Sequence, residues 1–402
     1  LNRSDAPNAF DPVLYWDNGM PAFAGKLPSK DPTLQNGSNI AWTLPNSLAQ
    51  GYVQHWNLGV QRELPKQMTV EVNYVGTKGT RLPGGTYHLA ALFNMTPSRY
   101  LALGDALYDN INDHPEIGKP YPSFEGTVNQ ALRPFPQYQG ISLTGFNVGS
   151  SIYHAMQVQF RKRPVKGGLG FIMAYTFSKT LTDNDDALGG YYYNNQDFYN
   201  RKSERSVAQF SHPHDLKLTW IWDLPIGKGR RFLNQGGIVD KVLGGWTLTA
   251  IQRYRSGNPL PSYDYNFDPG VIFTEVIRPD RLSGVTNYQK SSGYDLAHGT
   301  TWINPAAFSD PPHTVGGIPL SPGNAPRFLD IYGPWQPSET AAIHKHFMIT
   351  ERLSFEFRAE MENVFNRTQR RDPVMDFSSP DFGRIISVSG TRIVQFSGRI
   401  RF

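Results

Sequence analysis

A short acidic run is the first group of residues with the chemistry of a binding site. It comprises Asp183, Asn184, Asp185 and Asp186. Oxygen atoms of loop carboxylates at this spacing can coordinate a calcium ion. The run lacks the glycine and glutamate positions of an EF-hand loop, which favours a solvated turn over a metal site. Calcium binding by Asp183, Asp185 and Asp186 is therefore a hypothesis, and we expect no other cofactor.

A patch of aromatic and amide side chains follows the acidic run, at Tyr191, Tyr192, Tyr193, Asn194 and Asn195. Flat amphipathic rings beside adaptable amides suit the binding of a sugar or a peptide. The same tyrosines would equally suit an aromatic belt at a membrane interface, or packing within the loop. Replacing Tyr192 and Tyr193 by alanine separates these interpretations, because solute affinity falls only if the patch binds solute.

The other polar motifs do not form a catalytic or metal-binding group. Gly227-Lys228-Gly229 lacks the Walker spacing and a following helix with Ser or Thr, so it predicts a tight turn. His212, His214 and Asp215 lie at the start of a predicted strand, without the third convergent ligand that a metal site requires. The sequence shows no Ser/His/Asp order, paired acid or nucleophile elbow. We therefore expect no enzymatic activity.

Alternating apolar and polar residues predict the strands that position these groups. In residues 53–64, Trp56, Leu58 and Val60 are apolar, and the positions between them are polar or small. The same period of two recurs over residues 68–76, 152–160, 169–177, 216–224, 246–254, 340–347, 353–361 and 392–402. This period is typical of strands with one apolar face, and residues 238–243 predict a short helix. We count about 10 to 12 strands, each near the ~9 to 11 residues that a tilted membrane-spanning strand needs.

The polar positions of these strands predict that one face of the sheet contacts water. Gln157, Gln159, Arg161, Arg358 and Glu360 alternate with apolar neighbours. In a membrane barrel, the apolar positions face lipid and the polar positions face the lumen. We therefore predict that these five residues line a lumen.

Long and short connections alternate along the chain. Residues 83–146, 180–211 and 257–335 are crowded with Pro, Gly, Asn and Asp, whereas Pro65-Lys66-Gln67 is a short turn. Outer-membrane barrels show this asymmetry, with short periplasmic turns and long extracellular loops. Residues 1–50 show no periodicity of either kind and predict a loop that leads into the barrel.

The composition is compatible with a membrane barrel and excludes a helical membrane protein. Mean hydropathy is -0.45, and no apolar run approaches the ~18 residues of a spanning helix. Aromatic residues make up 13% of the chain, which suits belts at the membrane interfaces. The net charge of +5 is scattered rather than gathered into a stripe, which argues against a nucleic-acid partner.

The C-terminal strand ends on an aromatic residue. Phe396, Ile400 and the terminal Phe402 lie on the apolar side of its alternation. This arrangement is typical of the closing strand of a bacterial outer-membrane barrel. We predict that these three residues form the signal that the barrel-assembly machinery recognises.

Six segments, in this order, carry a family resemblance. They are YHAMQVQFRKR, GLGFIMAYTFSKTLTD, SHPHDLKLTWIWDLPIGKGRRF, VLGGWTLTAIQRYRSGNP, ERLSFEFRAEMENVFNR and RIVQFSGRIRF. Together they resemble the C-terminal barrel half of TonB-dependent outer-membrane receptors, closest to the subgroup with an N-terminal carboxypeptidase-regulatory-like domain. The resemblance covers most of residues 50–402. It implies an all-β fold in which this chain supplies about 10 to 12 of about 22 antiparallel strands of a transmembrane barrel.

The resemblance also implies a function and a set of partners. The intact receptor would take up a bulky solute with energy from a TonB-type coupler in the inner membrane. The other implied partners are outer-membrane lipid, the barrel-assembly machinery, and an N-terminal plug and barrel half of the same gene product. Residues 51–402 would then be the C-terminal part of a barrel in the bacterial outer membrane, with the plug absent from this chain.

Alternatives remain for both the assembly and the function. An open sheet in lipid leaves backbone groups unpaired at its edges, at several kcal/mol each, so further strands must complete it. Closure of this chain into its own smaller barrel is the alternative. A structural or adhesive role at the cell surface and passive porin activity are the alternative functions.

Overall fold

One large antiparallel sheet dominates the computed structural model, which describes residues 15, 17, 19, 36–42, 49–83, 92–143, 146–164, 168–184, 195–263, 277–289 and 299–402. Its main strands are β2 (Tyr52–Leu64), β3 (Met68–Pro83), β5 (Asn147–Lys162), β6 (Leu169–Thr182), β8 (His214–Asp223), β9 (Trp246–Arg255), β15 (Gln336–Met348), β16 (Ser354–Glu362) and β20 (Ile393–Arg401). Each strand pairs with the next in this order, and the short β7 (Ser206–Val207) pairs with β6 to make ten strands. The all-β fold and the count of about ten strands are confirmed.

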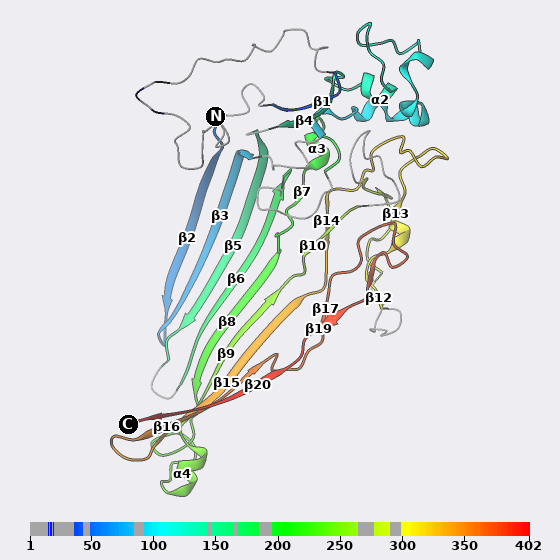
Figure 1. The fold of residues 1–402 in the computed structure, drawn as a ribbon. Coiled ribbons are helices and arrows are strands. Elements are labelled where there is room, and N and C mark those ends of the chain that lie inside the picture. The colour runs from blue at the N-terminus through cyan, green and yellow to red at the C-terminus, as the bar shows by residue number, and fades with distance from the viewer. Residues whose placement is uncertain are drawn as a thin grey trace.

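The two ends of the sheet differ, as the sequence predicts (Figure 1). At one end, the turn at residues 65–67 joins β2 to β3, with Lys66 and Gln67 at φ 63° and 58°. The same end carries the turn between β15 and β16 and the C-terminus. It also carries a longer β8–β9 connection that contains α4 (Ile238–Leu243), the predicted helix. We call this the turn end and the opposite end the loop end.

The loop end is a folded layer. Strand β1 (Ser38–Trp42), which lies within the segment predicted as a loop, pairs in parallel with β4 (Tyr138–Leu143). The helices of this end are η4 (Leu92–Asn94), η5 (Ser98–Tyr108), η6 (Ile111–Asp113), α2 (Val128–Ala131), α3 (Arg201–Glu204) and η8 (Pro305–Ala307). Its short strands form the pairs β10 (Pro259–Pro261) with β14 (Phe328–Tyr332), β11 (Asp280–Arg281) with β13 (Phe308–Ser309), β12 (Thr300–Thr301) with β18 (Arg384–Ile385), and β17 (Gln369–Arg370) with β19 (Val388–Ser389).

The compact apolar cores of the described residues lie in this layer, and Val148 of β5, at the loop end of the sheet, packs against the third of them. One core contains Leu260, Ile303 and Leu329, and a second contains Leu101 and Leu107, all fully buried. A third, smaller core packs Trp42 against Phe93 and Phe135, with ring centroids 6.1 and 5.0 Å from Trp42. The loops therefore have apolar cores of their own.

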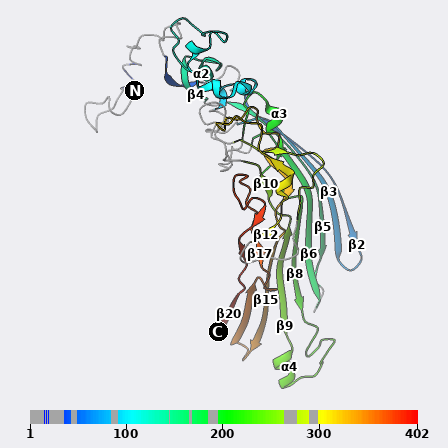
Figure 2. The same cartoon turned by 90° about the vertical axis from the view of Figure 1, so that its right-hand side faces the viewer.

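The sheet is curved but not closed (Figure 2). In the described residues, β2 pairs only with β3 and β20 only with β16, so both are edge strands. The alternative of a smaller self-closed barrel is therefore not what the described residues form. The open shape follows from the gradual twist and coiling of β-sheets, because ten strands make only part of a wide cylinder.

No helix among the described residues is long and apolar enough to cross a bilayer.

Candidate functional site: the concave face of the sheet

Cross-strand register divides the side chains of the sheet between two faces, because directly paired residues in an antiparallel sheet point to the same side. Val60, Val72, Val158, Tyr175 and Leu216 form one continuous row across five strands. The parallel row one residue along contains Gly59, Asn73, Gln157, Thr176 and Asp215. One face of the sheet is thus apolar and the other polar.

The apolar face is open to its surroundings. Leu58, Val60 and Phe396 are 73%, 70% and 69% exposed. Phe357 contacts both Trp246 and Phe396, with ring centroids 6.2 and 6.3 Å apart. A continuous exposed apolar face of this extent is far larger than the patches that soluble monomers tolerate. It is the surface expected of a wall that faces hydrocarbon.

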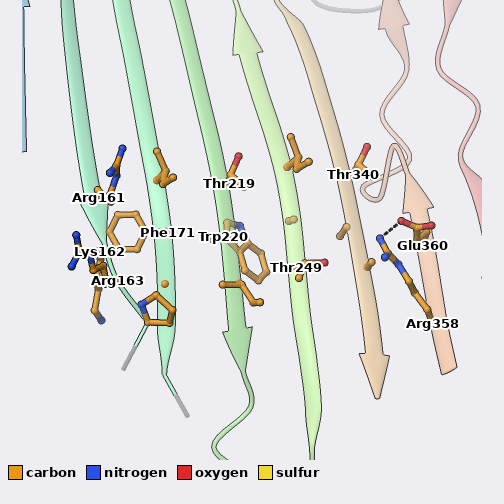
Figure 3. Close-up of a pocket in the computed structure, with 18 residues that line it drawn as sticks. Arg161, Lys162, Arg163, Phe171, Thr219, Trp220, Thr249, Thr340, Arg358 and Glu360 are labelled. Carbon is orange, nitrogen blue, oxygen red and sulfur yellow. Dashed lines mark hydrogen bonds and ion pairs between the residues drawn. The ribbon is translucent and has the colours of Figure 1, made fainter. Parts of the chain in front are cut away.

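The polar face is concave. A single hollow of about 470 Å³ is lined by residues of six neighbouring strands, from Arg161 on β5 to Glu360 on β16. Six adjacent strands can border one hollow only on the inner side of their curve. In Figure 3, Arg161 lies at one rim of this turn-end hollow, and Arg358 and Glu360 lie at the other.

Apolar side chains line the floor of the turn-end hollow. Ile172, Thr219, Ile251 and Thr340 are direct cross-strand partners in one row, and Ile221 lies in the next. All of them line the hollow. The hollow therefore has an apolar floor and a charged rim on an otherwise polar face, which suits an amphipathic ligand.

A second hollow, nearer the loop end, has a different chemistry. Its volume is about 520 Å³, and its wall includes Ser151, Thr176, Ser178 and Thr180 of the concave face. Asp215 also lines it, and Arg253 donates two hydrogen bonds to this carboxylate at 2.9 and 2.7 Å. This loop-end hollow therefore combines hydroxyl groups and a paired carboxylate with apolar walls at Leu82 and Phe210.

Comparison with known proteins agrees with this arrangement. Residues 2–395 match the model of the family described as "Outer membrane beta barrel domain". The chain belongs to this family. It is therefore a protein of the bacterial outer membrane. The exposed apolar face of this outer membrane beta barrel domain is accordingly the face that lipid covers.

Solved structures resemble the domain only distantly. The outer membrane transporter YddB from Escherichia coli is 9% identical at a TM-score of 0.40, with 91% of this chain and 34% of that chain covered. The ferripyoverdine receptor of Pseudomonas aeruginosa, bound to ferripyoverdine, is 11% identical at a TM-score of 0.35, with coverages of 87% and 27%. The domain thus spans about a third of the transporter's length. No functionally curated protein matches it in sequence.

The five residues predicted to line a lumen all lie on the concave face. Gln157 and Gln159 occupy adjacent rows, and Arg161 Nη2 donates to Gln159 Oε1 at 3.3 Å. Arg358 and Glu360 form an ion pair on β16. The domain's own strands therefore bring these residues to one surface, and their role in a closed lumen stays a prediction.

The predicted loop sites are only partly placed. Tyr191, Tyr192, Tyr193, Asn194, Asp185 and Asp186 lie outside the described residues. Asn195 is buried rather than offered at the surface. Asp183 accepts a hydrogen bond from the Ser150 backbone N–H at 2.7 Å and pairs with Arg201 at 3.3 Å. Both Asp183 oxygens thus have protein partners.

The motifs interpreted as structural are placed as such. Burial, with a smaller effect of Arg255, lowers the pKa of His212, and Nδ1 of its ring donates to the carbonyls of Ser256 and Gly257 at 3.1 and 3.2 Å. In the turn at 227–230, the Arg230 backbone N–H donates a hydrogen bond to the Gly227 carbonyl at 3.0 Å. Within the described part of the chain, no three Asp, Glu or His side chains converge as a metal site would require.

The sequence-based prediction missed the apolar floor. Its signal is nonetheless present, because Ile172, Ile221 and Ile251 each interrupt the alternation inside the runs Phe171–Met173, Trp220–Trp222 and Ala250–Ile251. Because neighbouring residues of a strand face opposite sides, two or more consecutive apolar residues place at least one of them on the polar face. Such runs mark apolar patches on the concave side.

Proposed function

We propose that the chain forms the C-terminal wall and outer loops of a TonB-dependent receptor that takes up a bulky solute with energy from the inner membrane. The observation that carries the proposal is the open curvature of the sheet. Ten strands have not closed, and the diameter of a barrel grows roughly linearly with the number of strands. The completed barrel would therefore be wide enough for both a bulky solute and a plug.

The folded loop end supports uptake of a particular solute. Its apolar cores make it a rigid layer over the outer mouth of the sheet, with hollows of distinct chemistry beneath it. Binding sites are typically built on such loops when a rigid scaffold holds them. In this proposal the loops bind the solute, the concave face guides it, and a plug domain of the receptor controls passage.

Uptake can be tested in the bacterium that encodes the protein. Strains lacking the receptor gene or the inner-membrane energy coupler should leave the same bulky solute in spent growth medium, as detected by comparative mass spectrometry. A protonophore should reproduce this effect in the wild-type strain. Uptake that continues without the coupler would overturn energised transport.

The competing functions predict other results. A passive porin predicts steady ion conductance of the purified full-length protein in planar bilayers, which a plugged receptor should not show. An adhesive component predicts loss of surface attachment in the deletion strain with solute consumption unchanged. Either result would replace the receptor proposal.

A further inference from the structure

Three arginines meet at a small cavity between the loop end of the sheet and a hairpin of the outer layer. The cavity measures about 330 Å³ and is lined by Arg255 of β9, Arg370 of β17 and the adjacent Arg371. The remaining lining residues are Asn258, Trp335, Gln336, Gln369, Asp372 and Ser389. We call it the arginine cavity; β17 and β19, which contribute Gln369, Arg370 and Ser389 to its lining, are labelled in Figure 1.

Several hydrogen bonds that do not use the guanidinium groups fix the walls of the arginine cavity. Gln369 Nε2 donates to the Pro337 carbonyl at 2.8 Å, which attaches β17 to β15. The Arg371 backbone N–H donates to Ser387 O at 3.1 Å, and Asn258 Nδ2 donates to Asp372 at 2.6 Å. The cavity is therefore held open by its frame before any ligand arrives, which lowers the entropic cost of binding.

The positive charge of the cavity is not balanced by the residues around it. Asp215, the cross-strand partner of Arg255, is already held by Arg253 through two hydrogen bonds. Arg255 donates to the neutral amide of Gln336. Among the described residues, none of the three cavity arginines forms a salt bridge with a carboxylate. Asp372 is the one acid in the lining, so the cavity carries an excess of two positive charges.

A larger cavity adjoins the arginine cavity. It measures about 850 Å³ and shares Arg255, Asn258 and Asp372 with its neighbour. Its other walls are mostly aromatic and aliphatic, with Tyr263, Phe328, Pro259, Pro261, Met375 and Ile386 among them. The two cavities together offer a cationic compartment beside a roomier and less polar one.

We propose that this pair of cavities is a solute-binding site for a bulky molecule with an anionic head, a carboxylate or a phosphate. The head would sit in the arginine cavity, where planar guanidinium groups bind such anions through paired charge-assisted hydrogen bonds. The less polar body would occupy the larger cavity. This inference rests on the proposed uptake function and adds the chemical class of the solute to it.

The test uses the purified full-length receptor in detergent micelles and calorimetric titration at constant ionic strength. Inorganic phosphate and citrate are the two probes, and glycerol is the neutral control. At least one of the two anions should bind, and glycerol should give no signal. The anion with the lower dissociation constant identifies the class of the head group, phosphate or carboxylate. Absence of binding by both anions would overturn the site.

Two sets of variants locate the binding. R370Q/R371Q should weaken anion binding by about tenfold or more, because it removes charge-assisted hydrogen bonds. R370K/R371K keeps the charge without the planar fork and should give an intermediate loss. R392Q removes one exposed arginine of the same connection that does not line the cavity, and it should leave binding unchanged. An equal effect of R392Q and R370Q/R371Q would show nonspecific attraction and contradict the proposal.

Failure of this inference is distinguishable from failure of the proposed function. If the energy coupler is required for uptake but neither anion binds, only the site is wrong. If anions bind through Arg370 and Arg371 while uptake needs no coupler, the energised mechanism is wrong and the site stands. Native folding of each variant is checked by the heat-dependent gel mobility of the barrel.

Discussion

Replacing Val158 by arginine is expected to destabilise the membrane-inserted receptor by about 2–4 kcal/mol, the cost of a cationic side chain on the lipid face near the middle of the bilayer. Val158 lies inside β5, between Val72 of β3 and Tyr175 of β6 on the apolar face. The new guanidinium could reach neither water nor a carboxylate without distorting the wall. Urea unfolding of the full-length receptor in lipid vesicles measures this loss directly.

Gln157→Arg is the matched control. Gln157 is the next residue of β5 and therefore lies at nearly the same depth, but its side chain is on the concave face between Asn73 and Thr176. This variant adds the same charge to a polar surface and should change the free energy of unfolding little. Equal destabilisation by the two substitutions would show that the face assignment is wrong.

The strands, their faces and the asymmetry of their connections could all be predicted from the sequence. Each follows from local features of the sequence, namely the period of two and the turn residues. The observed bounds lie within one residue of the expected ones for β2, for the turn at 65–67 and for α4. The long strands β3 and β5, with 16 residues each, exceed the expected length. Both continue into the loop end, where their pairing becomes irregular between Thr80 and Pro83.

Lys345 shows where local rules fail. Alternation assigns this lysine to the apolar face, yet it is buried, and its Nζ donates to the carbonyls of Lys241 and Val242 at 2.6 and 3.1 Å. Nζ also lies 5.5 Å from the Trp246 ring and 4.8 Å from that of Phe347. The C-terminal end of α4 supplies partial negative charge to the ammonium group. The sequence predicts α4 but not its docking against the outside of the sheet.

The arginine cavity could not be predicted for a related reason. Arg255 and Arg370 are 115 positions apart, and they meet only because residues 363–392 fold back over the ends of β9 and β15. That long connection was not among the three loops expected from the sequence. Contacts between loops depend on tertiary packing that no periodicity encodes, whereas the faces of a strand follow from its own residues.

The loop end should respond to mutation independently of the wall, and Glu204→Ala is the sharpest case. Glu204 and Arg278 are 0% and 1% exposed and 3.4 Å apart. Glu204 Oε1 also accepts the backbone N–H groups of Gln196 and Asp197, both at 3.0 Å. Truncation leaves a buried guanidinium without its counter-charge, which typically costs about 3–5 kcal/mol. Faster hydrogen exchange across residues 195–204 and 277–279 would report this loss.

Glu204→Gln separates charge from hydrogen bonding, because the amide oxygen can still accept the two backbone N–H groups. It should destabilise the loop end less than Glu204→Ala, while Glu125→Ala, at an exposed carboxylate of the same layer, should have almost no effect. Assembly in the membrane should stay intact in all three variants, since the side chains of Glu204, Arg278 and Glu125 come from outside the strands of the main sheet. Glu204→Ala should then speed hydrogen exchange in the loop end with a normal barrel, and Val158→Arg should damage the barrel with normal loop contacts. If either variant lost both the stability of the loop end and the assembly of the barrel, the loop end and the wall would not be independent.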